Sequence, residues 1–302
     1  SPSEYIWMKE YLQLEGLVYK LVPIRTPLNP NNPYMMGRLD SDLMYDIVMQ
    51  WSWGNSSSPE IYHDPETRKN SISFRSNMAR LAEQLLEEGK TKKAKNVIDL
   101  AIEKMPLDYF GYYSLMVPFV DAYYKLGESQ SAQKLASRIS FKYRDELEYF
   151  SSLRVNEQYM MGENVITEIE RYRTMVEAIL VNEDKVLLKT ELDLFVKSIT
   201  PFVFLYGEYD YYTSLALFVE GYYIAEETLK ARALIETIVP QYQERFEAIV
   251  GYAKKNKMPV LDRIKNEVLD YQELINISKS YDEKSYSDSL QLGFDGLIEK
   301  FN

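Results

Sequence analysis

The segment "YHDPETR", residues 62–68, brings together the side-chain types that most often bind a metal ion or move a proton. His63 is the only histidine of the chain, and Asp64 and Glu66 follow it closely. An imidazole and two carboxylates could ligate a divalent cation. The same residues also fit the start of a helix, because Asp64 can accept hydrogen bonds from first-turn amides and Pro65 suits the first helical position. We favour the helix start, so the sequence predicts no metal site here.

Adjacent carboxylates offer a second possible chemistry. Glu87 with Glu88, and Glu226 with Glu227, could act as the acid and base of a glycosidase-like site. The chain has 46 aspartates and glutamates among 302 residues, so adjacent pairs are expected by chance. Solvated helix faces explain them more simply. No glycine-rich phosphate loop is present either, and we therefore expect no catalytic residue and no cofactor in this chain.

Composition excludes several functional classes. The chain has no cysteine, which rules out disulfides, thiolate metal sites and cysteine nucleophiles. Its formal net charge of −11 argues against nucleic acid and against an anionic membrane surface. The most apolar stretch, residues 200–225, is interrupted by Glu208, Asp210 and Glu220, so it is too polar to cross a bilayer. We expect no direct membrane insertion and a buried helical core instead.

The elements around these residues divide into an arm and a helical region. Residues 28–66 contain the turn clusters "NPNNP" and "GNSSSP", which leave room for one short helix at 41–51. Asp40 or Ser41 can cap that helix. The stretch "EYLQLEGLVYKLVPIRTP", residues 10–27, fits neither a clean helix nor a clean strand, and we expect an extended piece packed on the helices. The predicted domains are an N-terminal arm and connector, 1–65, and a helical-repeat domain, 66–302.

Two shifts of the sequence against itself indicate repeats. A shift of 38 residues places Gly89 on Gly127 and Ala94 on Ala132. A shift of 99 residues places 120–150 on 219–249, where nine of 31 positions are identical. A recurring helix–turn–helix unit is typical of helical-repeat proteins. The pattern predicts antiparallel hairpins at 69–104, 109–143 and 202–254.

The unit resembles a tetratricopeptide repeat, in which small residues near the turn let two helices approach and a proline often closes the unit. The matching residues are Gly89, Ala94, Ala101 and Pro106 in the first unit, Gly127 and Ala132 in the second, and Ala231 in the third. The spacing of 38 departs from the usual repeat of about 34 residues, and Glu226 replaces the turn glycine. The predicted fold is all-α: a tetratricopeptide-like α-α superhelical array of stacked hairpins with a largely irregular or extended N-terminal arm. A non-repeating helical array is the alternative.

A wider resemblance rests on three strings in order: "YLQLEGLVYKLVP", "GRLDSDLMYDIVMQWSWGN" and "SFRSNMARLAEQLLEEGKTKKA". Together they resemble the C-terminal region of a large family of multi-pass membrane proteins of unknown function, mostly from Bacteroidetes. The N-terminal part of that family resembles protein O-mannosyltransferases. The likeness implies a glycosyltransferase-like parent that uses a lipid-linked sugar donor and carries its catalytic acid in the membrane half. It also implies that this chain is an extramembrane part of an inner-membrane protein, on the periplasmic side.

In tetratricopeptide repeats the first helix of each unit lines a concave groove. Through the two shifts, Glu83, Asp121 and Glu220 fall on one position, and Tyr124 and Tyr223 on another. Such a ladder would suit a basic peptide or a polyhydroxylated sugar; chance acids on a solvated face, and tyrosines packed in the core, are the alternatives. We predict a non-catalytic interaction or scaffold module that binds a protein partner or the membrane half of its own chain. The alternative is an auxiliary module that binds a carbohydrate or an acceptor.

Overall fold

A computed structural model describes residues 6–27, 36–256 and 261–299 of the chain. The chain forms two compact units, residues 1–139 and 140–302, whose boundary falls inside one long helix. Both units are built from helices, which confirms the predicted all-α array, and the described part of the arm before residue 41 contains three short strands and one 3-10 helix. The predicted domain boundary at residue 65 stays a prediction, since residues before and after it pack together in the first unit.

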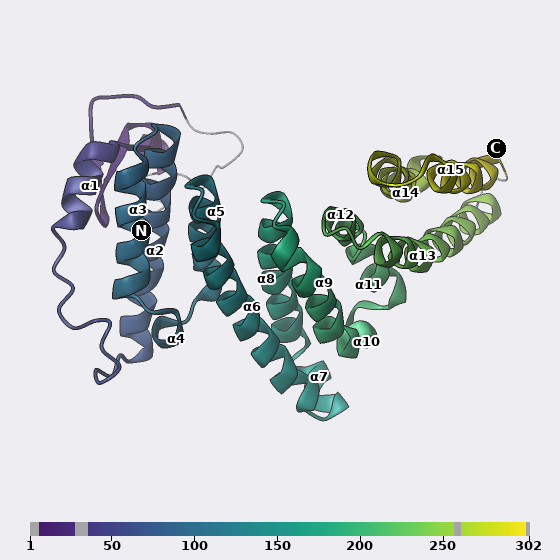
Figure 1. Ribbon diagram of the computed structural model, residues 1–302, viewed down its shortest axis with the longest axis horizontal. Helices are drawn as coiled ribbons and strands as arrows, with labels where there is room; N and C mark the ends of the chain where they lie inside the picture. Colours follow the sequence, from purple (N-terminus) through teal and green to yellow (C-terminus); the bar gives the residue numbers. More distant parts are fainter. Residues whose placement is uncertain (1–5, 28–35, 257–260, 300–302) are drawn as a thin grey trace. The chain divides into compact units, whose positions relative to one another are not determined.

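The first unit contains the arm and two hairpins. Helix α2 runs antiparallel beside α3, and α1 lies against both, with the short strands nearby (Figure 1). The elements are β1 (Leu12–Glu15), β2 (Val18–Leu21), β3 (Arg38–Leu39), α1 (Ser41–Met49), α2 (Pro65–Glu87), α3 (Thr91–Lys104), α4 (Leu107–Phe110), α5 (Val117–Lys125) and α6 (Ser129–Ser152), with 3-10 helices at Ile6–Tyr11 and Tyr113–Met116.

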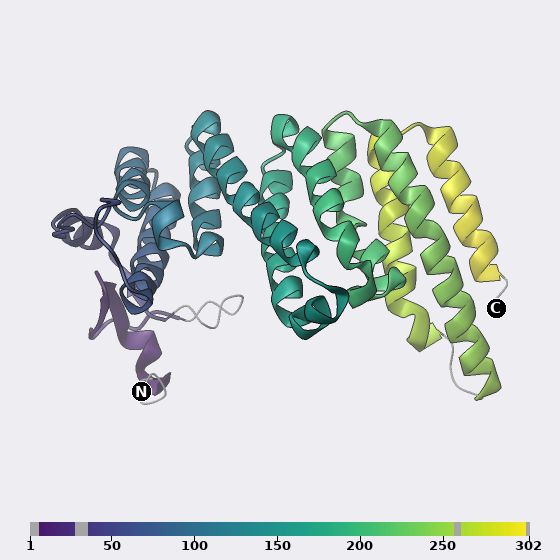
Figure 2. The same ribbon diagram turned by 90° about the horizontal axis from the view of Figure 1, so that it is seen from below.

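The second unit takes the later part of α6 and continues with helices alone. Helices α13, α14 and α15 run side by side at its C-terminal end (Figure 2). The elements are α7 (Val155–Met160), α8 (Gly162–Val181), α9 (Lys185–Ile199), α10 (Val203–Tyr206), α11 (Glu208–Ser214), α12 (Leu217–Ile224), α13 (Thr228–Lys255), α14 (Leu261–Tyr281) and α15 (Lys284–Glu299), with a 3-10 helix at Thr200–Phe202. No helix in the described ranges combines the length and the apolar character that a bilayer crossing requires.

The arm folds into a small sheet with the strand order β2-β1-β3. Strand β1 pairs antiparallel with β2 and parallel with β3, and its leucines Leu12 and Leu14 are buried. Helix α2 anchors the sheet, because Asn77 donates to the carbonyl of Gly16 at 2.9 Å and Arg80 donates to that of Gly37 at 2.7 Å. The mixed pattern of the arm therefore reflects a strand pair that buries only one of its strands.

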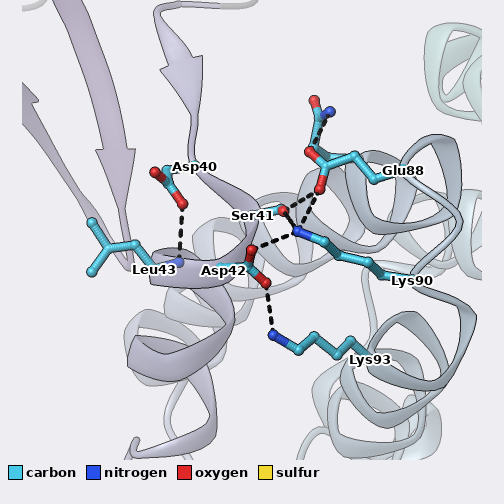
Figure 3. A network of polar contacts seen from close by, with 8 residues as sticks. Asp40, Ser41, Asp42, Leu43, Glu88, Lys90 and Lys93 are labelled. Carbon is cyan, nitrogen blue, oxygen red and sulfur yellow. Dashed lines mark hydrogen bonds and ion pairs between the residues drawn. The ribbon is translucent and has the colours of Figure 1, made fainter.

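A polar network ties α1 to the turn between α2 and α3 (Figure 3). Asp40 caps α1, as one of the two predicted candidates, by accepting from the amide of Leu43 at 3.1 Å. Asp42 lies 2.7 Å from both Lys90 and Lys93, and these hydrogen bonds lower the pKa of Asp42 to about 2. Glu88 accepts a hydrogen bond from Ser41 and forms an ion pair with Lys90. Because Ser41 belongs to α1, helix α1 holds the turn between α2 and α3.

Four hairpins share one kind of turn. Two residues after the end of each first helix lies a residue with left-handed backbone. The amide of the next residue donates to a carbonyl five residues back, as from Lys90 to Leu85 at 2.8 Å in the first hairpin. This is the hydrogen-bond pattern of a helix that closes on a left-handed residue, usually glycine. The four left-handed residues are Gly89, Gly127, Glu183 and Glu226. The hairpin α8–α9 therefore belongs to the series, although the sequence shows no turn glycine there.

The left-handed backbone of Glu183 offers a test of stability. A side chain with a Cβ disfavours this conformation, and Glu183 is exposed at the turn. We expect Glu183→Gly to raise the free energy of unfolding by about 1 kcal/mol, because it removes that strain. Gly127→Ala, at the equivalent turn, should lower it by a similar amount. Urea unfolding of both variants measures the change; a destabilised Glu183→Gly variant would contradict the shared turn geometry.

The hairpins repeat as a larger block. A shift of 94 residues places α2–α3 on α8–α9, and each residue buried in α2 or α3 then falls on a buried residue. The shift of 99 residues places α5–α6 on α12–α13, where Phe119, Val120 and Tyr123 fall on Phe218, Val219 and Tyr222. Short helices connect the two hairpins in both blocks. The array is thus two copies of a four-helix block with a longer connector in the second.

The predicted hairpin limits need correction. The second hairpin begins at Val117, because Gly111 and Tyr112 both have left-handed backbone before it. It ends at Ser152, since buried Leu147 and Phe150 extend the apolar face of α6. The third hairpin begins at Leu217, after the separate short helices α10 and α11. The ends of the hairpins are thus set by residues with left-handed backbone and by the spacing of buried apolar residues, and not by the limits of the sequence alignment.

Ala94, Ala132 and Ala231 are each fully buried, one turn into the second helix of their hairpins. We expect replacement of any of them by leucine to destabilise the chain by roughly 1–3 kcal/mol, because added methylenes overpack a filled core. Ala233→Leu is the matched control, since Ala233 is exposed on α13. Thermal melts of the four variants test this. If the three core variants have the same melting temperature as the parent, the alanines are not sites of close helix packing.

Candidate functional site

In the first unit, a hollow opens between α2 and α5. It has a volume of about 200 Å³ and is lined by Ala79, Glu83, Leu86, Pro118, Asp121, Ala122 and Lys125. Both α2 and α5 are first helices of their hairpins, so this is the face on which the sequence places a groove. The structure brings two of the predicted residues, Glu83 and Asp121, to the same hollow. Tyr124, also on α5, is half-buried.

In the second unit, a larger hollow of about 400 Å³ lies among α11, α12, α13 and α14. Four carboxylates line it: the predicted Glu220, together with Asp210, Asp270 and Glu273. Its apolar part comes from the partly exposed Leu217 and from the buried residues Tyr242 and Leu274. The lining residues include no lysine or arginine. The hollow is therefore an acidic opening with an apolar floor.

The charges of this hollow are poorly neutralised. No ion pair among the residues that the structure describes includes Asp210, Glu220, Asp270 or Glu273; Glu220 instead accepts a hydrogen bond from Tyr281 at 3.0 Å. Burial raises the pKa of Asp270, and the charge of Glu267 adds to this effect. Both effects disfavour the charged carboxylate. A positively charged ligand would reverse that penalty.

Tyr223 is more buried than expected for a residue that lines an open groove. Its side chain is 6% exposed, and its ring stacks on Tyr281 at 5.8 Å between ring centres. Its hydroxyl donates to Asp282 at 2.7 Å, and Arg232 holds the same carboxylate. The five predicted residues are divided between two units, with Glu83, Asp121 and Tyr124 in the first and Glu220 and Tyr223 in the second. A surface shared by all five stays a prediction.

Sequence reasoning missed four acids as site candidates. Asp210 on α11 and Asp270 and Glu273 on α14 line the acidic hollow, and neither shift aligns α14 with a predicted position. Glu177 on α8 is the fourth: the 94-residue shift places it on Glu83, and it pairs with Arg173 at 2.8 Å. The signal that could have found Glu177 is the repeated burial pattern of α8, because the turn glycine that marks the hairpins α2–α3 and α5–α6 is missing there.

The other candidate chemistry has structural roles. Asp64 caps α2 by accepting from the amides of Glu66 and Thr67, which confirms the predicted helix start. The His63 ring lies 5.1 Å from Tyr109 and Phe110, centre to centre, and its Nε2 is 3.1 Å from the carbonyl of Ser56. The described ranges contain no group of three or more potential metal ligands.

The adjacent glutamates at the turns form ion pairs with lysine side chains. Glu88 pairs with Lys90, Glu226 with Lys185, and Glu227 with Lys189. These hydrogen bonds to lysine lower the pKa of each of the three carboxyls. A general acid at neutral pH needs a raised pKa instead, so these pairs are poor candidates for acid–base catalysis.

A second hollow in the later unit, about 360 Å³, lies between α6 and α9. At its wall Arg144 reaches Glu191 at 2.5 Å and the hydroxyl of Tyr172 at 2.9 Å. Tyr172 also donates to Glu191 at 2.9 Å, so the three groups form a closed triangle. Burial raises the pKa of Tyr172, and the charge of Glu191 adds to it. Every charged group in this triangle has its partner, which indicates a structural role.

The comparisons with known proteins place only the start of the chain. Residues 1–43 match the family model of TMEM260-associated domain 2. This match links the chain to a TMEM260-like family, and it covers the arm up to the first residues of α1. No curated protein and no solved structure matches the chain significantly.

Proposed function

We propose that this chain is a non-catalytic interaction module of a larger, glycosyltransferase-like membrane protein, and that it binds a basic, extended segment of a protein partner. The partner is a second protein or the membrane half of the same polypeptide, and the module acts on the periplasmic side. The match of residues 1–43 supports a place in a TMEM260-like protein. The tetratricopeptide-like character of the array, in which first helices line a groove, supports a binding role.

The observation that carries this proposal is the acidic hollow among α11–α14. Its carboxylates have no cationic partner in the described part of the chain, and its floor is apolar. Lysine and arginine side chains combine a cationic head with an apolar stem, and they satisfy both features at once. A sugar would need an open aromatic face to stack on, but Tyr242, the aromatic residue that lines this hollow, is 1% exposed. This difference favours a basic peptide over a glycan.

Site-specific photo-crosslinking in the parent protein tests the proposal. The photoreactive residue p-benzoylphenylalanine replaces Leu217 in the hollow or, as a control, Leu229, which is 80% exposed on α13 and does not line it. We expect a defined adduct from position 217, mapped by mass spectrometry to a segment rich in lysine or arginine. Position 229 should give none, because its side chain does not reach the bound segment.

Charge removal provides the second arm. Glu220→Gln combined with Glu273→Gln should weaken the adduct at position 217 and leave the melting temperature unchanged, since Glu273 is exposed and glutamine keeps the acceptor that Tyr281 uses. Added salt should act in the same direction, because exposed charges are screened. Equal crosslinking from both positions, or an adduct that is insensitive to these charges, would contradict the proposal.

A further inference from the structure

Exposed apolar side chains are concentrated in the N-terminal arm. Among the residues that the structure describes, 26 large apolar side chains are exposed, and seven of them lie within the 18 residues 7–24. Trp7 is 76% exposed, Val18 64% and Leu21 57%. Single exposed apolar residues are ordinary, whereas a contiguous group on a soluble surface marks an interaction site. This group centres on β2, all of whose residues are exposed.

Among the described residues, no strand pairs with the outer edge of β2. In the order β2-β1-β3, β2 ends the sheet, and β1 is its partner. The amide of Val22 donates to the carbonyl of Tyr11 at 2.8 Å, and the pairs along an antiparallel ladder alternate between bonded and non-bonded. With Leu21 opposite Leu12 and Tyr19 opposite Leu14, the residues Tyr19 and Leu21 fall on the non-bonded positions. Their amides and carbonyls therefore point away from β1.

We propose that the outer edge of β2 accepts an extended segment of a partner polypeptide, apolar in character and with a carboxylate facing Lys20. Added strands bind by backbone hydrogen bonds and are selected by their side chains. Here Tyr19 and Leu21 supply the backbone groups, and Val18 and Leu21 supply apolar surface on the two faces of β2. The side chain of Lys20 is 62% exposed, so it can meet a facing carboxylate, although it also lies 3.5 Å from Glu15, whose side chain is 17% exposed. This interaction is independent of the acidic hollow.

Two other occupants fit the edge less well. A lipid bilayer could receive the apolar side chains, but its hydrocarbon would leave the outward amides and carbonyls without partners, at a large cost. A second copy of this chain, paired antiparallel about Lys20, would set two ammonium groups opposite each other, which destabilises a strand pair. A different polypeptide with a carboxylate at this position avoids both penalties.

The test uses a capped peptide probe of alternating valine and threonine with a central glutamate, added to the isotope-labelled chain. NMR should show saturable binding that slows hydrogen exchange at the outward amides of Tyr19 and Leu21. The amides of Val18 and Lys20, already bonded to β1, should change little and serve as internal references. No saturable binding, or binding that leaves the two outward amides unprotected, would overturn the proposal.

Variants separate backbone pairing from simple hydrophobic contact. Leu21→Pro removes one outward donor without taking a bond from β1, a position at which an edge strand tolerates proline. It should weaken binding of the probe about three- to tenfold, which corresponds to the loss of one hydrogen bond. Leu21→Thr is the control that keeps the amide, and it should weaken the probe less. Equal loss in both variants would overturn the backbone role.

Charge and lipid arms complete the experiment. Lys20→Glu should weaken the glutamate probe and strengthen a matched lysine probe, because the facing charges are reversed. Vesicles of phosphatidylethanolamine and phosphatidylglycerol should leave the fluorescence of Trp7 unshifted. A blue shift with vesicles and no change with either peptide would assign the surface to a membrane and overturn the proposal.

Discussion

Arg144→Met should lower the free energy of unfolding of the second unit by about 3–5 kcal/mol, because it leaves Glu191 buried without its cation. Glu191 is 4% exposed, and Arg144 is its ion-pair partner at 2.5 Å. Methionine keeps much of the side-chain volume, so the loss reports on the charge rather than on a cavity. Tyr172 still donates to the carboxylate. Denaturant unfolding followed by helical circular dichroism measures the change.

The double variant Arg144→Met, Glu191→Leu should recover much of the loss, since replacing both charges removes the unpaired carboxylate. Arg154→Met is the surface control: Arg154 and Glu157 form an exposed pair within one helical turn, and the melting temperature should not change. Additive effects of the two central substitutions would show that Arg144 and Glu191 do not act as a pair. The double-mutant cycle thus isolates the interaction from the packing of its members.

Arg75→Ala is the second large effect that we expect, again about 3–5 kcal/mol. Arg75 is fully buried on α2 and donates to the carbonyls of Met105 at 2.9 Å and Gly111 at 2.5 Å, which follow α3 and α4. Alanine leaves both carbonyls without these donors and opens a cavity. Burial lowers the pKa of Arg75 to about 10, so relief from a buried charge offsets part of the cost.

The contrast with Arg75→Met tests this balance. Methionine fills most of the space and carries no charge, and we expect it to be less destabilising than alanine. Thermal and urea unfolding of the two variants give the order. A melting temperature of Arg75→Ala equal to that of the parent would show that Arg75 does not hold the ends of α3 and α4. Arg80→Met would serve as a comparison, because Arg80 anchors the carbonyls of Met36 and Gly37 instead.

Turn glycines mark two of the four hairpins in the sequence. Gly89 and Gly127 mark left-handed turns because glycine tolerates that backbone, and the small alanines after them mark the packed second helix. At Glu183 the same turn is made by a residue that disfavours it, so the local signal is absent while the packing is preserved. Tertiary packing overrides local preference there, and only the burial pattern identifies the hairpin.

The candidate site was predictable to the extent that it follows the repeat. Glu220 was found because α12 aligns with α5, whereas Asp270 and Glu273 come from α14, which aligns with neither block. Prediction of the core has the same limit. The spacing of Arg75 on α2 indicates a buried position, but an arginine side chain is expected at the surface. Proximity between elements far apart in the chain has no local signature, and such residues need the fold to be found.

The two blocks repeat one polar cluster, which links each block's first hairpin to its second. Tyr123 donates to Asp99 at 2.8 Å while Lys95 reaches Glu128, and in the later block Tyr222 donates to Asp193 at 3.0 Å while Lys189 reaches Glu227.

These clusters bear on how the chain opens. In a linear array, cooperativity depends on the coupling between neighbours. A bond from one hairpin to the turn of the next raises that coupling, so the linked hairpins should fray as one unit. Native-state hydrogen exchange would then report a shared opening energy for α2, α3 and α5, and a second shared value for α8, α9 and α12.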